Sequence, residues 1–358
     1  DLESAEMKDF SLRLNSVREL IAEHNLEALV IRKNPNLAWF IGGRVHVPLT
    51  LDLACFDIVV YQDKVIAVTN KIEAPRLIAE EFPAGIEVAA IDWWQGRDAL
   101  LPAGEKIGAD QPGNSRIDLG SEIEKLRQSL SESEVSKFQE VCKDSAVALG
   151  NAIKLTQVND REIDVTARIA NALWQSNLEL VFIGVAGESR VRNFRHPLPT
   201  DAKIGNRVVA SICARRKGMI ASVTRIASFE ENFDSYKNIL LVEAALFDAT
   251  KVGARFSEPI HAAIKAYPEF GFEELEWQKH HQGGPTGFAA RDWPANQNSQ
   301  QLIRSNQPIA WNPTGNGWKA EDTILAKESG VEILSVDPNW PAIVVAGRNR
   351  PAVLRLSK

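Results

Sequence analysis

Two adjacent histidines, followed by a glutamine and two glycines, form the segment of this sequence best suited to chemistry. They are His280 and His281, in the stretch 279–287. Neighbouring side chains point in different directions on a strand or a helix, so we expect at most one imidazole to face a cavity. Glycines allow the backbone to approach a ligand closely. We therefore predict that His280, His281 and Gln282 line a polar pocket; the alternative is an irregular turn.

A second polar position is Asn312, which lies between Trp311 and Pro313. The proline favours extended geometry for the residue before it. The side-chain amide of Asn312 offers a ligand both a donor and an acceptor. We expect this residue to face a ligand as well.

The first half of the chain holds one unusual short segment, Gly42-Gly43-Arg44-Val45-His46. Two glycines, an arginine and a histidine between apolar runs predict a loop built for contact. Arg44 could bind a carboxylate through both arms of its planar guanidinium. The alternative is a surface turn with a solvated arginine.

The composition is that of an ordinary globular protein and excludes several classes of function. The chain has 358 residues, with 41 Lys+Arg against 47 Asp+Glu and a net charge of -6, which gives no reason to expect a nucleic-acid partner. We find no run of about 18 apolar residues that would span a bilayer, and the start, without an initiator Met, does not resemble a signal peptide. The three cysteines are far apart in sequence, which favours a reducing cytoplasm and argues against a thiolate metal cluster.

The hydrophobic pattern predicts two domains with a boundary near residues 126–134. For the first domain we expect, in chain order, a helix at 8–26, a strand at 28–31, a break at 34–36, a hairpin of strands 56–61 and 65–69, a helix at 72–81 and a strand at 106–110. Ser131 with Glu134 has the form of a capping box, which opens the next helix at about 134–155. For the second domain we expect helices at 161–176, 233–251 and 257–267, and strands at 180–185, 207–212, 220–226, 308–311, 323–326 and 342–345. The overall class is α+β.

Four polar segments of the second half, in this order and spacing, resemble the creatinase/aminopeptidase P family, which has the pita-bread fold of prolidases. The segments are 184–201, 208–225, 279–287 and 309–325. The stretch 34–43 is similar to that family's segment ahead of its linker. The resemblance spans nearly the whole chain. It implies an N-terminal creatinase-like α/β domain at 1–130 and a C-terminal pita-bread domain at 131–358.

The resemblance also implies where metal ligands would stand. The family's metallopeptidases hold two divalent ions with two aspartates, one histidine and two glutamates, and bridging carboxylates suit such a pair. In this sequence Ser211, Ser222, Gly284 and Asn312 stand at four of these positions, and only Glu321 keeps a carboxylate. Hydroxyl and amide groups bring no negative charge. We therefore expect no dinuclear metal site and no cofactor.

The remaining roles are carried over from the resemblance. His196 stands where creatinase, which works without metal, has a histidine that shuttles a proton; imidazole titrates near neutral pH, so His196 could be a general base or acid. The alternative is a turn histidine bonded to the backbone. Glu321 could orient His196, bind a cationic group, or pair with Lys319 or an arginine. Arg291 stands where the peptidases carry a further catalytic histidine.

In creatinase-like dimers, the region around Arg44 resembles a loop that enters the neighbour's active site and holds a substrate carboxylate. The resemblance therefore implies a homodimer, with a small-molecule or short-peptide ligand and no nucleic-acid or membrane partner.

We predict a metal-independent creatinase-like hydrolase, or C–N bond-cleaving enzyme, for a small carboxylated amide, guanidine or amino-acid derivative. The alternatives are a non-catalytic ligand-binding or peptide-binding protein of the same fold, as in a histone chaperone, and a divergent Xaa-Pro metallopeptidase. The expected catalytic residues are His196 and Glu321. The expected substrate-binding residues are Arg44, His46, Ser211, Ser222, His280, His281, Gln282, Arg291, Asn312 and Lys319.

Overall fold

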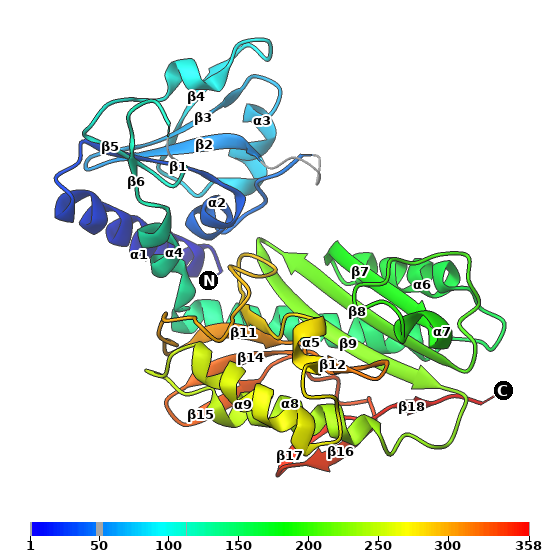
Figure 1. Cartoon of the computed structure of the whole chain (residues 1–358). Coiled ribbons are helices and arrows are strands. Elements are labelled where there is room, and N and C mark those ends of the chain that lie inside the picture. Colours follow the sequence, from blue (N-terminus) through cyan, green and yellow to red (C-terminus); the bar gives the residue numbers. More distant parts are fainter. Residues whose placement is uncertain (1, 48–52, 112, 358) are drawn as a thin grey trace. The chain divides into compact units, whose positions relative to one another are not determined.

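The computed structural model describes residues 2–47, 53–111 and 113–357 (Figure 1). The chain divides into two compact units, residues 1–128 and residues 129–358. Each unit has its own sheets and helices, so the two are described separately. No helix in the described part of the chain combines the length and the apolar character that crossing a bilayer requires.

The first unit is built on one mixed six-stranded sheet with the strand order β4-β3-β2-β1-β5-β6. The pairs β1–β2 and β2–β3 are antiparallel, while β3–β4, β1–β5 and β5–β6 are parallel. This unit is therefore of the α/β type. Its elements are α1 (Leu2–Glu23), β1 (Ala28–Lys33), α2 (Asn34–Ile41), β2 (Leu53–Tyr61), β3 (Val65–Asn70), α3 (Ala74–Arg76), the π-helical turn η1 (Leu77–Glu81), β4 (Ile86–Ile91), the 3-10 turn η2 (Arg97–Leu100), β5 (Ile107–Ala109), β6 (Ile117–Asp118) and α4 (Gly120–Gln128).

The hairpin predicted at 56–69 is confirmed, because β2 and β3 pair in register and the amide of Tyr61 donates to the carbonyl of Lys64. The break expected at 34–36 is confirmed, because strand β1 ends at Lys33. The helix α2 that begins at this point was not expected; it has Pro35 in its first turn, and Gly42 ends it at φ 70°. A proline is well tolerated in the first turn of a helix, and glycine readily takes the left-handed conformation at its end.

The single helix expected at 72–81 is also interrupted. One short α-helical turn passes directly into η1, in which the amide of Phe82 donates to the carbonyl of Leu77. The wider π turn ends at Glu81, whose carboxylate accepts from both the backbone and the side chain of Arg44. Through Glu81, this helical segment thus contacts the loop at Arg44, which is distant in sequence.

The second unit contains two four-stranded sheets, β18-β9-β8-β7 and β10-β11-β14-β15, and two small hairpins, β12–β13 and β16–β17. Its helices are α5 (Glu132–Ile153), α6 (Glu162–Gln175), α7 (Glu188–Val191), α8 (Tyr236–Ala249), α9 (Ser257–Glu269) and the 3-10 turn η3 (Glu276–Lys279). Its strands are β7 (Glu179–Gly187), β8 (Arg207–Arg216), β9 (Met219–Ser228), β10 (Gly283–Pro285), β11 (Gln307–Trp311), β12 (Thr314–Gly315), β13 (Trp318–Lys319), β14 (Asp322–Lys327), β15 (Gly330–Ile333), β16 (Ala342–Val345), β17 (Arg348–Pro351) and β18 (Leu354–Arg355).

Helices cover the two sheets of this unit (Figure 1). Helices α5 and α6 pack on the β7–β9 sheet, and α8 and α9 enclose a large apolar core with β11 and β14. The capping box predicted at the start of α5 is confirmed, because the Ser131 hydroxyl accepts from the Glu134 amide and the Glu134 carboxylate accepts from the Ser131 amide. The cap fixes where the unit's longest helix begins.

The two sheets meet along β9 and β14. The Thr323 hydroxyl accepts from the Ser222 amide at 2.9 Å and donates to the Ser222 carbonyl at 3.0 Å. The Thr224 amide donates to the Glu321 carbonyl at 3.0 Å. These bonds hold Glu321, which directly precedes β14, beside Ser222 and Thr224 of β9.

A buried ionic network lies directly behind Glu321. Asp322 accepts from Arg225 at 3.0 Å and from Arg350 at 2.6 Å, and Arg350 also makes a two-pronged contact with Glu243 at 2.7 and 2.8 Å. All four side chains are at most 4% exposed. Two positive and two negative charges balance in this network, and their contacts link β9, β14, α8 and β17.

Candidate functional site

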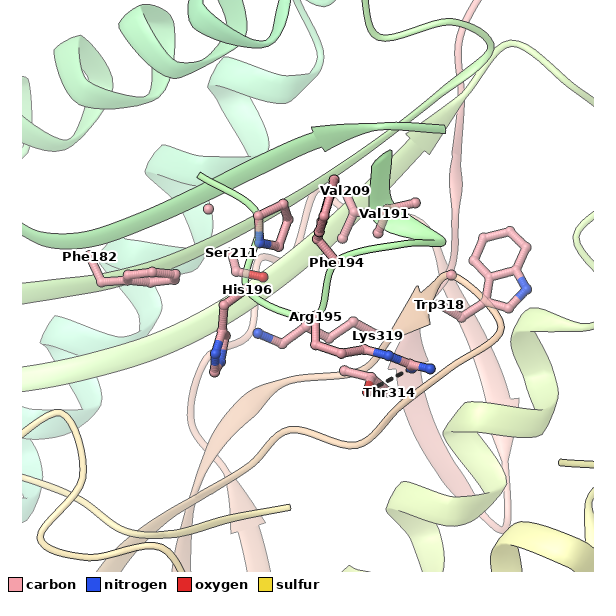
Figure 2. Close-up of a pocket in the computed structure, with 13 residues that line it drawn as sticks. Phe182, Val191, Phe194, Arg195, His196, Val209, Ser211, Thr314, Trp318 and Lys319 are labelled. Atoms are coloured by element: carbon pink, nitrogen blue, oxygen red, sulfur yellow. Dashed lines mark hydrogen bonds between the residues drawn. The ribbon is translucent and has the colours of Figure 1, made fainter. Parts of the chain in front are cut away.

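A cavity opens in the second unit beside β8 and the β13 hairpin (Figure 2). Its space is about 410 Å³, open mouth included. Its wall combines polar and aromatic side chains. The polar side chains are Arg195, His196, Ser211, Thr314 and Lys319, and the aromatic ones are Phe182, Phe194 and Trp318.

A chain of hydrogen bonds leads from the cavity wall to Glu321. Ser211 on β8 faces Thr224 on β9 in the strand register, and their hydroxyl oxygens are 2.7 Å apart. Thr224 donates its proton to Glu321 Oε2 at 2.8 Å. The Thr224 oxygen must therefore accept from Ser211, and Ser211 is left with lone pairs toward the cavity.

Glu321 is enclosed by two cations. Lys319 Nζ lies 2.9 Å from Glu321 Oε2, and Arg291 Nη2 donates to Glu321 Oε1 at 2.9 Å. A second arm of Arg291 donates to Ser222 Oγ at 3.0 Å. Both oxygens of the carboxylate are thus engaged. Among the roles considered for Glu321, the structure shows the ion pair, and it is formed with both Lys319 and an arginine.

This arrangement should make stability depend on acid pH. Burial alone would raise the pKa of Glu321, but the charges of Lys319 and Arg291 outweigh it and lower that pKa to about 2. A carboxyl group with a depressed pKa in the folded state contributes stability above its unfolded pKa, near 4.5, and loses it as the pH falls toward 2. The contribution corresponds to about 3 kcal/mol.

We therefore expect Glu321→Gln to flatten the dependence of the unfolding free energy on pH between about 5 and 2, measured by urea unfolding at several pH values. The control is Glu124→Gln, which removes a carboxylate of the other unit that accepts a hydrogen bond from Gln128. An equal slope for wild type and Glu321→Gln would contradict the ion-pair assignment.

Three imidazoles meet at the edge of the cavity. His196 Nε2 and His280 Nε2 are 2.8 Å apart, and the rings of His280 and His281 stack with centroids 4.5 Å apart. One ring nitrogen of each of the three lies within 4.8 Å of the others. The expectation that the two adjacent rings diverge is wrong, because this loop is neither strand nor helix and turns both rings toward His196.

The contacts of His280 determine where its proton sits. Burial, followed by the nearby Lys319 charge, lowers the pKa of His280 to about 2, so the ring is neutral near pH 7. Its Nδ1 faces the carbonyl of His281, which can only accept, so the single proton is on Nδ1. Nε2 of His280 then accepts a hydrogen bond from the Nε2–H of His196, and Nδ1 of His196 carries the lone pair.

The other two histidines are also kept neutral. Burial, then Lys319, lowers the pKa of His196, and burial, then Arg291, lowers the pKa of His281 to about 4. Imidazole is a common ligand of transition metals, so the three rings have the donor type for one ion. The charges of Lys319 and Arg291 face them and oppose a dication.

Gln282 and Asn312 differ in how they are used. The Gln282 amide accepts from Tyr267 and donates to the carbonyls of Trp277 and His280, so both of its N–H donors are used in holding the loop together. Asn312 is buried, its backbone amide donates to Gln282, and its side-chain oxygen has no hydrogen-bond partner among the described residues. Of the two, Asn312 is the one able to meet a ligand.

Gly284 occupies a position where no side chain fits. A Cβ there would overlap the carbonyl oxygen of Trp293, and Gly284 has φ 159°. The strand β10 pairs it with Ala310 on β11. The backbone is therefore packed closely at the place where the resemblance puts a metal-binding histidine.

Arg44 and His46 belong to the first unit. Arg44 is held by Glu81 at 2.6 Å and by Glu80 at 3.2 Å, and both contacts are within that unit. His46 is half-buried. The cavity of Figure 2 is lined by residues of the second unit.

Several residues of the site carried no sequence signal that we used. Thr224 lies two positions after Ser222 in a strand, so it shares that residue's face, and this alternation could have identified it. Arg195 donates to Thr314 at 3.1 Å and to Glu276 at 2.6 Å, and these partners are 119 and 81 residues away. Such pairings depend on the fold and have no local pattern.

Comparison with known proteins identifies the fold. No family model matches the chain. A curated Xaa-Pro dipeptidase of Pyrococcus horikoshii is 20% identical over 344 residues, which cover 90% of this chain and 96% of the relative. The crystal structure of the prolidase from the same organism superposes with a TM-score of 0.76 at 19% identity, covering 90% of this chain and 98% of the prolidase.

A second similar structure is a domain of a subunit of a complex. The N-terminal domain of the FACT complex subunit SPT16 from Cicer arietinum superposes with a TM-score of 0.71 at 11% identity, covering 92% of this chain and 96% of that domain. At these identities the likeness establishes the fold, and the activity has to be argued from the site. The chain therefore has the pita-bread fold of the prolidases, as its motifs predicted.

Proposed function

We propose that the chain is a hydrolase for a C–N bond in a small carboxylated amide, guanidine or amino-acid derivative, and that it works without the metal pair of its relatives. The proposal rests on one observation. Glu321, the only carboxylate among the five positions that the resemblance assigns to metal ligands, already forms ion pairs with Lys319 and Arg291.

The donor groups present do not fit a pair of divalent ions. Arg291 and Lys319 would have to leave Glu321 before a cation could approach it. The hydroxyls of Ser211 and Ser222 are weak ligands for such ions unless they lose a proton, and Gly284 cannot be replaced by a ligand without moving the backbone at Trp293. The side-chain cations of Lys319 and Arg291 thus occupy the surroundings of Glu321 that divalent metal ions would need.

His196 is the residue we propose for proton transfer. Hydrolysis of a C–N bond needs one proton removed from the attacking water and one delivered to the leaving nitrogen. Nδ1 of His196 is the free base of the cluster, and His280 orients the ring through Nε2. The lowered pKa makes the protonated ring a stronger acid than an ordinary imidazolium, which favours delivery of the proton to the leaving group.

Glu321 has a different role from the one expected. Because both of its oxygens are taken, we propose that it holds Lys319 and Arg291 in position and does not bind a cationic substrate group. Lys319 then lies against the cavity with its charge fixed.

The test is an activity screen of the purified chain with N-acyl amino acids, guanidino acids and Xaa-Pro dipeptides, with and without a chelator, and with products identified by mass spectrometry. We expect turnover of an amide or guanidine that the chelator does not change, and no stoichiometric metal by elemental analysis. Two bound ions per chain together with chelator-sensitive Xaa-Pro hydrolysis would instead establish the divergent metallopeptidase alternative.

A second candidate is a binding protein without catalysis. The likeness to a FACT complex subunit favours it, because that name describes a component of a complex. Its distinguishing result would be a ligand or peptide that raises the melting temperature of the chain while no product forms.

We further propose a cytoplasmic homodimer. The described cysteines Cys55, Cys142 and Cys213 are unpaired, which suits a reducing compartment. If Arg44 serves a neighbouring subunit's cavity, it must give up its contacts with Glu80 and Glu81. Sedimentation of the wild type and of Arg44→Gln would measure the assembly and the part of Arg44 in it.

A further inference from the structure

We infer that the cavity binds the carboxylate of an aromatic or aliphatic acid, with Lys319 as the anchoring cation. The inference deepens the proposed function, because it concerns the same cavity, and it moves the carboxylate anchor from Arg44 to Lys319. It holds equally if the chain binds its ligand without converting it.

The first step is the hydrogen-bonding capacity of Lys319. Its side chain is 8% exposed, and it lines the cavity with Ser211 and His196. An ammonium group has three N–H donors. Among the described residues Glu321 is its one ion-pair or hydrogen-bond partner, so two donors are left for a ligand at a nearly buried position. Figure 2 shows its chain running from the β13 hairpin toward His196.

The second step is the charge around the cavity. Arg195 is matched by Glu276, a buried carboxylate that it contacts at 2.6 Å. Glu321, in contrast, is shared by Lys319 and Arg291, so this part of the site keeps one unit of positive charge. The lowered pKa of His196 and of His281, to which Lys319 and Arg291 both contribute, agrees with a positive field. An anion with a single charge would neutralise it.

The third step is the apolar part of the wall. Phe182, Phe194 and Trp318 line the cavity, and Trp318 lies on the β13 hairpin. Figure 2 places Phe182 and Trp318 at opposite ends of the cavity, with Lys319 between them. Aromatic walls contribute affinity for a flat or aliphatic body, and a few placed polar groups fix its orientation. The combination suits an acid with an apolar body better than a hydrated oxyanion such as phosphate.

The experiment compares phenylacetate with phenylacetone, which has the same ring and a methyl ketone in place of the carboxylate. Neither probe contains a C–N bond, so the result does not depend on whether the chain is a hydrolase. Calorimetric titration of the wild type should give affinity for phenylacetate at least about tenfold higher than for phenylacetone. Raising the salt concentration from about 20 to about 200 mM should weaken only the acid.

Two variants locate the anchor. Lys319→Met should abolish the preference for the acid, whereas Lys327→Met, which removes a lysine paired with Glu332 at the surface end of β14, should keep it. Unfolding curves show whether each variant is folded, and the salt effect on the wild type needs no variant. Equal affinity for the two probes, or a preference that survives Lys319→Met, would overturn the inference. Displacement of phenylacetate by inorganic phosphate at similar concentration would overturn the assignment of a carboxylate.

Discussion

Replacing Arg350 by methionine is expected to lower the free energy of unfolding of the 129–358 unit by about 3–5 kcal/mol. Arg350 is the only cation that contacts Glu243 in the described network, and it also contacts Asp322. Methionine fills similar volume but leaves Glu243 as a buried charge with no partner. Removing one member of a buried ion pair costs far more than the pair contributes against an apolar substitute, because the remaining charge has lost its water.

The chain supplies a matched control two residues away on β17. Arg348 contacts Asp248 at the surface, with the aspartate side chain 63% exposed. Its replacement by methionine should cost no more than about 1 kcal/mol. Urea unfolding, followed by tryptophan fluorescence and fitted for two units, measures both variants. A loss for Arg350→Met as small as that for Arg348→Met would show that the network does not hold the unit together.

A double variant identifies the origin of the loss. Adding Glu243→Gln to Arg350→Met removes the unpaired charge, so part of the lost stability should return. Contacting residues commonly show such coupling. The double variant could instead be less stable than Arg350→Met by the full amount that Glu243→Gln costs in the wild type. In that case the loss in Arg350→Met would come from packing and not from charge.

The sequence predicted the elements well where a local pattern encodes them. The β2–β3 hairpin, the Ser131 capping box and the strands β7, β8 and β9 follow from alternation, turn residues and caps. The break of β1 before Pro35 was predicted, but the helix α2 that begins there was not, because a proline can end one element and begin the next.

The site was harder to predict, because its contacts join residues far apart in the chain. The resemblance led us to interpret Ser211 and Ser222 as replaced ligands, but the register that sets Ser211 opposite Thr224 depends on how β8 and β9 pair. His196 and His280 are 84 residues apart and meet through two loops without regular structure. Likewise, the charges of Lys319 and Arg291 could be counted in advance, but their convergence on Glu321 could not.

Replacing His196 by alanine is expected to lower kcat/KM by about 10²–10⁴-fold for whichever substrate the activity screen identifies. The variant removes the only imidazole of the cluster that lines the cavity, while His280 loses a hydrogen-bond partner but keeps its contact with the carbonyl of His281. His281→Ala is the matched control, because it removes a neighbouring ring that stacks on His280. Unchanged turnover in His196→Ala would exclude this residue as the proton carrier.

The pH profile tests the same role without removing the residue. A base works when it is unprotonated, so the rate should fall as the pH drops through the folded pKa of His196, which burial and Lys319 place below 6.5. Lys319→Met removes one of the two cations that lower this pKa and leaves Glu321, which raises it. The acid limb of kcat/KM should therefore move to higher pH in that variant and stay in place in Lys327→Met. An acid limb that stays in place in Lys319→Met would show that another group is the base, because Lys319 is the charge that lowers the pKa of His196 most after burial.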